Sequence, residues 1–198
     1  SRGEKVNFNQ PGIDSITLNR VIGNEKSIIE GILNAEGQVW LLNRNGLLFG
    51  RNAAINTAGL LATTRELSDE DFLEGNYEFY GDSQEAVINR GSIDINNSGY
   101  VALLGKEIVN EGLIRAELGE VHLRGGKGFS LDLNGNSMVD LTVTEGELKA
   151  MVDNKKAIIA DGGEVYLTTN AVDDLLGGVV NNEGIVEAKS LNDVLGQE

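Results

Sequence analysis

The sequence predicts an all-β protein: a right-handed parallel β-helix with extra-helical hairpins or strands and one or two short helices. Three observations predict this fold. Short motifs recur at multiples of about 21 residues, apolar residues alternate within each copy, and Gly and Asn stand at the predicted corners. The composition agrees, because 40% of the 198 residues are hydrophobic but only 5% are aromatic, which favours stacked strands rich in small branched side chains.

The pattern Gly-x-Val-x-Leu recurs at intervals close to three, one and two multiples of about 21 residues. A period of this length indicates one coil of a solenoid, and the alternation within each copy indicates a strand. Val and Leu are expected to point into the coil, and the residue between them is expected to point outward. The four copies begin at Gly37, Gly99, Gly119 and Gly163, and their outward residues are Trp40, Ala102, His122 and Tyr166.

A second pattern, Asn-x-Gly-x-Ile/Val, begins at Asn89, Asn110 and Asn182, and its first two copies are 21 residues apart. Gly supplies positive φ angles at corners, and Asn tolerates the same conformation. Buried Asn side chains can also stack in hydrogen-bonded ladders between coils. The two patterns together therefore predict two or three short strands per coil.

Bulk composition excludes several classes of function. The formal net charge of −15 disfavours binding to nucleic acid or anionic lipid. The sequence has no Cys, so it can form neither disulfides nor Cys-ligated metal sites. No apolar run is long enough for a transmembrane helix. We predict no cofactor, no metal and no nucleic-acid partner.

Two segments, about 64–86 and 128–156, interrupt the repeat and are predicted to leave the coil. In the first, the acidic run Ser68–Asp71 indicates a solvated loop or a helix N-terminus rather than a Ca²⁺ site, and the aromatic residues 77–80 indicate a strand on the outside of the rod. In the second, Asn134-Gly135 between alternating stretches predicts a hairpin. Short helices are predicted after Thr144, which would cap the first of them, and at 172–176.

Several segments resemble, in order, the N-terminal domain of two-partner secretion exoproteins, which is the haemagglutination activity domain of filamentous haemagglutinin/haemolysin-like adhesins. The stretch 37–50 resembles the hallmark of that family, whose signature is Asn-Pro-Asn-Gly-Ile. Asn43, Asn45 and Gly46 match it, whereas Arg44 stands where the family has Pro and Leu47 where it has Ile. The other similar segments are 6–11, 18–21, 54–64, 99–105 and 179–188.

The resemblance implies five candidate site residues: Asn43, Asn45 and Gly46 from the signature, with Asn19 and Arg20 from the family's preceding conserved turn. Two roles remain open for the signature, which could fix a corner of the coil or contact the secretion machinery. Arg44 removes the turn geometry that Pro would preset, but Asn-Gly is itself a strong turn pair.

The resemblance further implies a single secretion domain over residues 1–198 that lacks its N-terminal cap. Such a domain directs secretion and nucleates folding of a large exported adhesin or cytolysin, and it is not an enzyme. Its partner is an outer-membrane two-partner transporter with periplasmic POTRA domains, and downstream regions could bind host-cell receptors. The expected location is secreted or on the Gram-negative cell surface, reached through the periplasm.

Two other functions are considered. A carbohydrate-active β-helix enzyme, such as a polysaccharide lyase or hydrolase, would need convergent acids in a groove, and the candidates are Asp94, Arg115, Glu117, Glu120 and Arg124. An ice-binding solenoid would need regular Thr ladders, which the sequence lacks. His122 is the only histidine, and at an outward strand position we expect it to be solvated.

Overall fold

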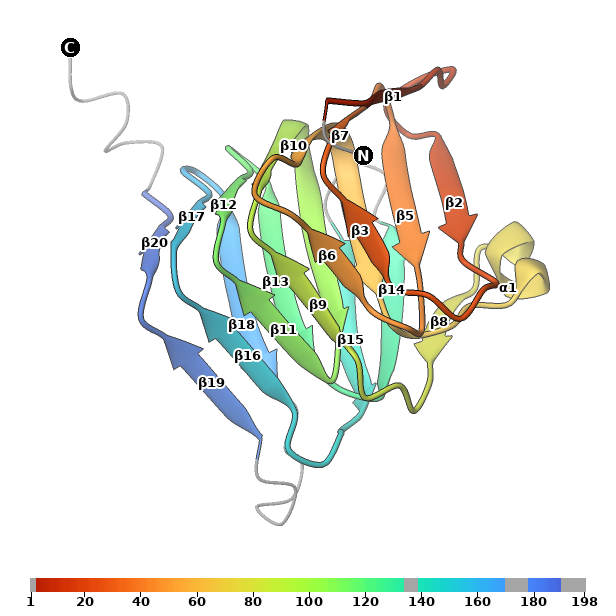
Figure 1. The fold of residues 1–198 in the computed structure, drawn as a ribbon, viewed down its shortest axis with the longest axis vertical. Helices are drawn as coiled ribbons and strands as arrows, with labels where there is room; N and C mark the ends of the chain where they lie inside the picture. Colours follow the sequence, from red (N-terminus) through yellow and green to blue (C-terminus); the bar gives the residue numbers. More distant parts are fainter. Residues whose placement is uncertain (1–2, 134–138, 170–177, 190–198) are drawn as a thin grey trace.

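The computed structural model describes residues 3–133, 139–169 and 178–189, and it is a parallel β-helix (Figure 1). Each coil contributes three strands, and each strand pairs in parallel with its equivalent in the next coil. The first strands are β1 (Lys5–Phe8), β4 (Ile32–Ala35), the start of β7 (Ala54–Thr63), the start of β10 (Ser92–Gly105), β12 (Leu113–Arg115), β17 (Ala157–Ile159) and β20 (Ile185–Glu187).

The second strands are β2 (Ile16–Arg20), β5 (Gln38–Leu42), the ends of β7 and β10, β13 (Glu120–Gly125) and β18 (Glu164–Thr169). The third strands are β3 (Ser27–Ile29), β6 (Leu47–Phe49), β9 (Ala86–Asn89), β11 (Glu107–Asn110), β16 (Met151–Asn154) and β19 (Val179–Asn182). The predicted fold class is therefore confirmed.

The Gly-x-Val-x-Leu copies occupy equivalent positions along one axis. Val101 pairs with Val121, which pairs with Val165, while Val39 and Val101 both pair with Leu60. All of these except the half-buried Val165 are fully buried inside the coil. Stacking identical apolar residues at one register is what gives the solenoid a continuous core.

The repeated glycines are required for a different reason from the one predicted. Gly99, Gly119 and Gly163 do not have positive φ angles. A Cβ at Gly119 would lie 2.1 Å from the carbonyl oxygen of Gly99, and one at Gly163 would lie 1.9 Å from that of Gly119. Glycine is needed at these corners because the backbones of successive coils approach too closely for any side chain.

A ladder of asparagine side chains runs through the coils, as the second pattern predicted. Asn89 Nδ2 donates to Asn110 Oδ1, Asn110 Nδ2 donates to Asn154 Oδ1, and Asn154 Nδ2 donates to Asn182 Oδ1, each at 2.8 Å. Asn89, Asn110 and Asn154 are fully buried. The ladder satisfies polar groups that would otherwise be costly in the interior.

Asn110→Ala is expected to lower the free energy of unfolding by about 2–3 kcal/mol, because it leaves the buried amides of Asn89 and Asn154 each short of a partner. Urea denaturation measures the change. Asn34→Ala is the matched control, since Asn34 belongs to an exterior ladder with Asn7 and Asn56 and is only half-buried. Equal losses for the two variants would contradict this account.

The two excursions form a separate layer on the outside of the coil. The first contains α1 (Asp69–Glu74), capped by the Ser68 side chain, and β8 (Tyr77–Tyr80), as predicted. The second contains the antiparallel pair β14 (Gly128–Leu133) and β15 (Val139–Glu145), and β14 also pairs with β8. This antiparallel sheet covers the outer face of the second strands.

The covered face corrects one prediction. Trp40, Ala102 and His122 point out of the coil, as predicted, but His122 is buried beneath the outer sheet rather than solvated, and Tyr166 is half-buried. Trp40 and Ala102 belong to a second hydrophobic core between coil and outer sheet.

Two details of the second excursion also differ from prediction. Thr144 lies within β15 and begins no helix, because the chain continues as an antiparallel strand there. The coil resumes with β16 at Met151, before residue 156, where the excursion was expected to end. The Asn134-Gly135 turn and the helix expected at 172–176 lie outside the described residues. In the part of the chain that the structure describes, no helix is long and apolar enough to cross a membrane.

Candidate functional site

The candidate signature forms a tight corner between β5 and β6. The backbone N–H of Gly46 donates to the Asn43 carbonyl at 3.0 Å, which closes a four-residue turn. Gly46 has φ +98°, and a Cβ there would lie 3.2 Å from the Ala86 carbonyl oxygen and 3.3 Å from Lys26 Cε. Gly46 therefore meets both demands that favour glycine, a left-handed backbone and a close approach to neighbouring coils.

The side chain of Asn43 is almost fully buried and holds this corner to the preceding coil. Its Nδ2 donates to the Glu25 carbonyl at 2.9 Å and to Ser27 Oγ at 2.8 Å. Its Oδ1 accepts from the backbone N–H of Asn45 at 2.9 Å. Asn45 Nδ2 reaches Gly23 O at 2.8 Å, so both amides bridge the same two turns.

Arg20 extends from β2 toward the first excursion. Its guanidinium forms an ion pair with Asp69 at 2.6 Å, in the first turn of α1, and also donates to the Leu67 carbonyl. Asn19 lies apart from this group, because it pairs with Leu41 on the opposite, inward side of the strand. Arg20 and Asn43 line the same small pocket, so Arg20 lies beside the signature corner, whereas Asn19 faces the coil interior.

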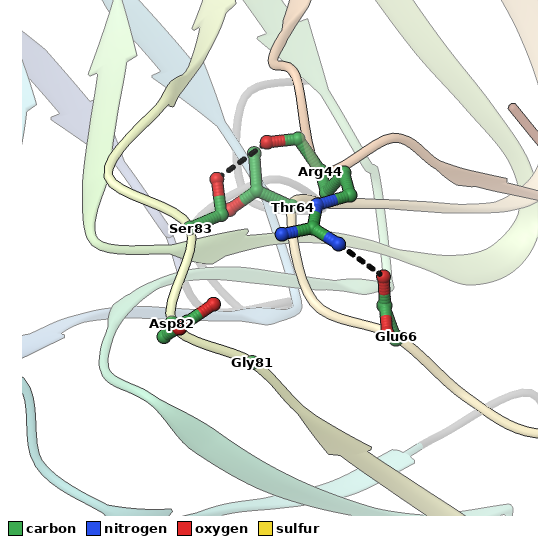
Figure 2. A pocket seen from close by; sticks show the side chains of 6 residues that line it. All are labelled: Arg44, Thr64, Glu66, Gly81, Asp82 and Ser83. Atoms are coloured by element: carbon green, nitrogen blue, oxygen red, sulfur yellow. Dashed lines mark hydrogen bonds and ion pairs between the residues drawn. The ribbon is translucent and has the colours of Figure 1, made fainter. Parts of the chain in front are cut away.

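Arg44, the departure from the family signature, joins the corner to both ends of the first excursion. Its carbonyl accepts from Ser83 Oγ at 2.5 Å, and its guanidinium lies 3.7 Å from the Glu66 carboxylate (Figure 2). These residues, with Thr64, Gly81 and Asp82, line a small cavity of about 40 Å³. The corner is therefore one of the places where the coil contacts the first excursion.

Arg65 ties the two excursions to one another. Its side chain is fully buried, and Nε and Nη2 donate to the Gly126 carbonyl at 3.0 and 2.6 Å. Nη1 donates to Ser83 O at 2.8 Å, and Glu147 lies 3.6 Å away. Burial lowers the pKa of Arg65, which the nearby carboxylate of Glu147 partly offsets. No spacing motif marks Arg65 in the sequence, because its partners are backbone carbonyls of distant loops.

A polar cluster lies farther along the covered face. His122 Nε2 is 3.0 Å from Glu120 Oε2, and that oxygen also accepts the backbone N–H of Val139 at 3.2 Å. The His122 ring stacks on Tyr166 with centroids 4.7 Å apart. Burial lowers the pKa of His122, although the hydrogen bond to Glu120 opposes this shift.

We expect acidification below the ordinary histidine pKa of 6.5 to destabilise the fold through His122. The unfolded chain binds a proton as pH falls through that value, whereas the buried ring resists protonation. Proton binding therefore stabilises the unfolded state relative to the folded state. The loss of melting temperature between pH 7.5 and 5.5 should be smaller in His122→Gln than in the parent chain. Identical losses would show that the ring does not contribute.

The residues considered for catalysis do not converge. Asp94 and Arg115 form an ion pair at 2.6 Å on the first-strand face, whereas Glu120 and Arg124 lie on the second-strand face. Glu120 is buried and already accepts two hydrogen bonds. Among the described residues, no group of three or more His, Cys, Asp or Glu side chains could hold a metal ion.

The parallel coil, its covering sheet and the asparagine corner define the class of β-helical secretion domains. A family model, the TPS secretion domain, matches residues 1–197. The chain therefore belongs to the TPS secretion domain family, and it is a secretion-directing domain.

Known proteins agree with this assignment. Two proteins from Haemophilus influenzae, both named heme/hemopexin-binding protein, are 33% and 31% identical over 84% and 98% of the chain, which covers 19% and 23% of their lengths. The crystal structure of the HMW1 secretion domain from Haemophilus influenzae matches with a TM-score of 0.83 and 29% identity, over 94% of the chain and 48% of that domain. The chain thus spans about a fifth of the curated relatives and about half of the solved domain.

Membership in this family indicates how the protein is exported. TPS exoproteins are secreted by Gram-negative bacteria, and a TPS domain is recognised by an outer-membrane transporter. The family is not a family of enzymes, and the comparisons give no support to the carbohydrate-active alternative.

Proposed function

We propose that this chain, as one domain without catalytic activity, is bound by the POTRA domains of its transporter while still unfolded. Export then runs through the periplasm, and the domain folds outside to nucleate the β-helix of a surface-exposed protein. Regions downstream would bind host-cell receptors. Parallel coils depend on non-local pairing and fold slowly, which leaves time for unfolded transit. Extended, sheet-forming segments can add as strands to a partner's sheet edge.

Within this proposal, the Asn43–Gly46 corner serves export through the shape of the coil. The observation that carries this role is the burial of Asn43, whose amide is occupied by Glu25 O, Ser27 Oγ and Asn45 N. With these internal partners, the Asn43 side chain helps to decide whether the second coil closes on the first. In this proposal, that closure belongs to the folding that follows transit.

Asn43→Ala is expected to reduce secretion at least ten-fold when the domain is co-expressed with its cognate transporter, because the corner loses four hydrogen bonds. Secreted and cell-retained protein are compared by immunoblot. The purified variant should also be destabilised by about 2–3 kcal/mol in urea, since buried partners are left unpaired.

Arg44→Pro is the matched control. It restores the family residue at the second position of the turn, where Pro is favoured, and should leave secretion unchanged. If Asn43→Ala lost secretion while keeping parental stability, the corner would act by direct recognition instead. Secretion of the parent chain without any transporter would reject the proposed export route.

A further inference from the structure

A buried hydroxyl at the junction between the coil and the first excursion has no internal partner. Thr64 is 1% exposed, and in the described part of the chain its Oγ1 is the one buried side-chain polar atom that makes no hydrogen bond. Buried polar groups are normally paired, because desolvation penalises an unpaired one. Thr64 lines the cavity of about 40 Å³ beside Arg44. A volume of about 10–15 Å³ already admits one water-sized group, so this cavity has room for a small ligand.

Two carboxylates, those of Glu66 and Asp82, line the same cavity. Figure 2 shows the Thr64 hydroxyl and the Asp82 carboxylate turned toward the space next to the Arg44 guanidinium. That guanidinium forms only a long ion pair with Glu66, at 3.7 Å, and both side chains are 61% exposed. Asp82 forms no ion pair with any described residue, although its charge acts on Arg65 from a greater distance.

The groups around the cavity carry one negative charge in excess. Two guanidinium groups meet three carboxylates there, and they belong to Arg44, Arg65, Glu66, Asp82 and Glu147. Arg65 lies 3.6 Å from Glu147, and Arg44 faces Glu66, so Asp82 supplies the additional charge. A small cation is therefore the class of ligand that the electrostatics of this cavity favour.

The segments that carry these oxygens are held in place by hydrogen bonds. Glu66 and Tyr80 exchange both of their backbone hydrogen bonds, at 2.9 and 3.0 Å. Ser83 Oγ donates to the Arg44 carbonyl at 2.5 Å. Apart from the guanidinium, the lining side chains offer only oxygen atoms, from two hydroxyls and two carboxylates. Such a set suits a hard cation such as Ca²⁺ or Mg²⁺.

We propose that this cavity is a Ca²⁺ site, with the carboxylates of Glu66 and Asp82 and the hydroxyl of Thr64 among its ligands. Ca²⁺ accepts irregular oxygen sets completed by water, whereas Mg²⁺ demands near-octahedral geometry. Two carboxylates beside a guanidinium make a weak site, so we expect a dissociation constant of about 10⁻⁴–10⁻³ M, as in extracellular Ca²⁺ modules. The sequence predicted no metal, because only the folded excursion brings these oxygens together.

Titrating the ¹⁵N-labelled chain with CaCl₂ at constant ionic strength tests the proposal by NMR. We expect saturable shifts of the amide signals of residues 64–66 and 81–83, and at least ten-fold weaker binding of Mg²⁺. Saturating Ca²⁺ should also raise the melting temperature, because the ion joins the end of a coil strand to both ends of the excursion.

Three variants locate the ion. Asp82→Asn should weaken Ca²⁺ binding at least ten-fold, and Thr64→Val several-fold. Arg44→Gln should tighten it several-fold, because the competing positive charge is removed. Asp94→Asn is the matched control, since that carboxylate is paired with Arg115 on another face and the variant should bind as the parent does.

Amide shifts spread evenly over the acidic surface would mean that Ca²⁺ only screens charge, and would overturn the proposal. Equal binding of Mg²⁺, or parental affinity in Asp82→Asn, would do the same. Without Ca²⁺, Thr64→Val should melt no lower than the parent, because valine leaves no hydroxyl unpaired. A lower melting temperature would show that the hydroxyl already has a partner, and would also overturn it. Should Thr64→Val fail to fold, Asp82→Asn and Arg44→Gln decide, because both of these side chains are exposed.

Discussion

Arg65→Met is expected to lower the free energy of unfolding by about 3–5 kcal/mol, because it removes every donor at a fully buried junction. Methionine fills much of the same space but donates no hydrogen bond. The carbonyls of Gly126 and Ser83 and the carboxylate of Glu147 would lose their shared partner. The outer layer should loosen before the coil does, since Arg65 fastens one excursion to the other.

Urea denaturation monitored by the fluorescence of Trp40, the only tryptophan, reads out the outer layer directly. Arg44→Met is the matched control: its ion pair with Glu66 joins two side chains that are each 61% exposed, and such pairs contribute little. We expect the control to lose less than about 0.5 kcal/mol of its free energy of unfolding. A loss below about 1 kcal/mol for Arg65→Met would mean that the carbonyls find other partners.

Trp40→Ala is expected to lower the free energy of unfolding by about 3–5 kcal/mol, because it leaves a large cavity between coil and outer sheet. The indole packs edge-on against the Tyr77 ring, with ring centroids 4.7 Å apart, and its centroid lies 5.7 Å from that of Phe79. Its Nε1 donates to Tyr100 Oη at 2.7 Å, and Tyr100 Oη donates to Gln38 Oε1 at 2.7 Å. The substitution therefore also breaks a buried hydrogen-bonded chain.

Circular dichroism in urea measures the stability of this variant, and hydrogen exchange should show lost protection in β8 and β14 before the coil strands. Tyr80→Ala is the control, because this aromatic residue in β8 is 51% exposed, and we expect a loss below about 1 kcal/mol. Parental protection of β8 and β14 in Trp40→Ala would show that the outer sheet is held by other contacts.

Part of the candidate site could be predicted from the sequence. Resemblance singled out Asn43, Asn45, Gly46 and Arg20, which do meet at one corner, but also Asn19, which faces the coil interior. Arg65 and Ser83 belong to neither repeated motif, and they interact with backbone carbonyls of loops. Their roles could therefore be recognised only once the folded loops were known. His122 was expected to be solvated because strand alternation gives direction but not what lies beyond the surface.

The sequence by itself determined the coil. Its period, its alternation and its Asn positions are local and repetitive, and stacking in register is the one arrangement that buries Val39, Val101 and Val121 together. The outer layer was decided by tertiary structure. Strands β8 and β14 are far apart in the chain and pair only when the coil brings their excursions together. That pairing turns an outward face into a second core, because burial depends on what packs against a strand as well as on which way its side chains point.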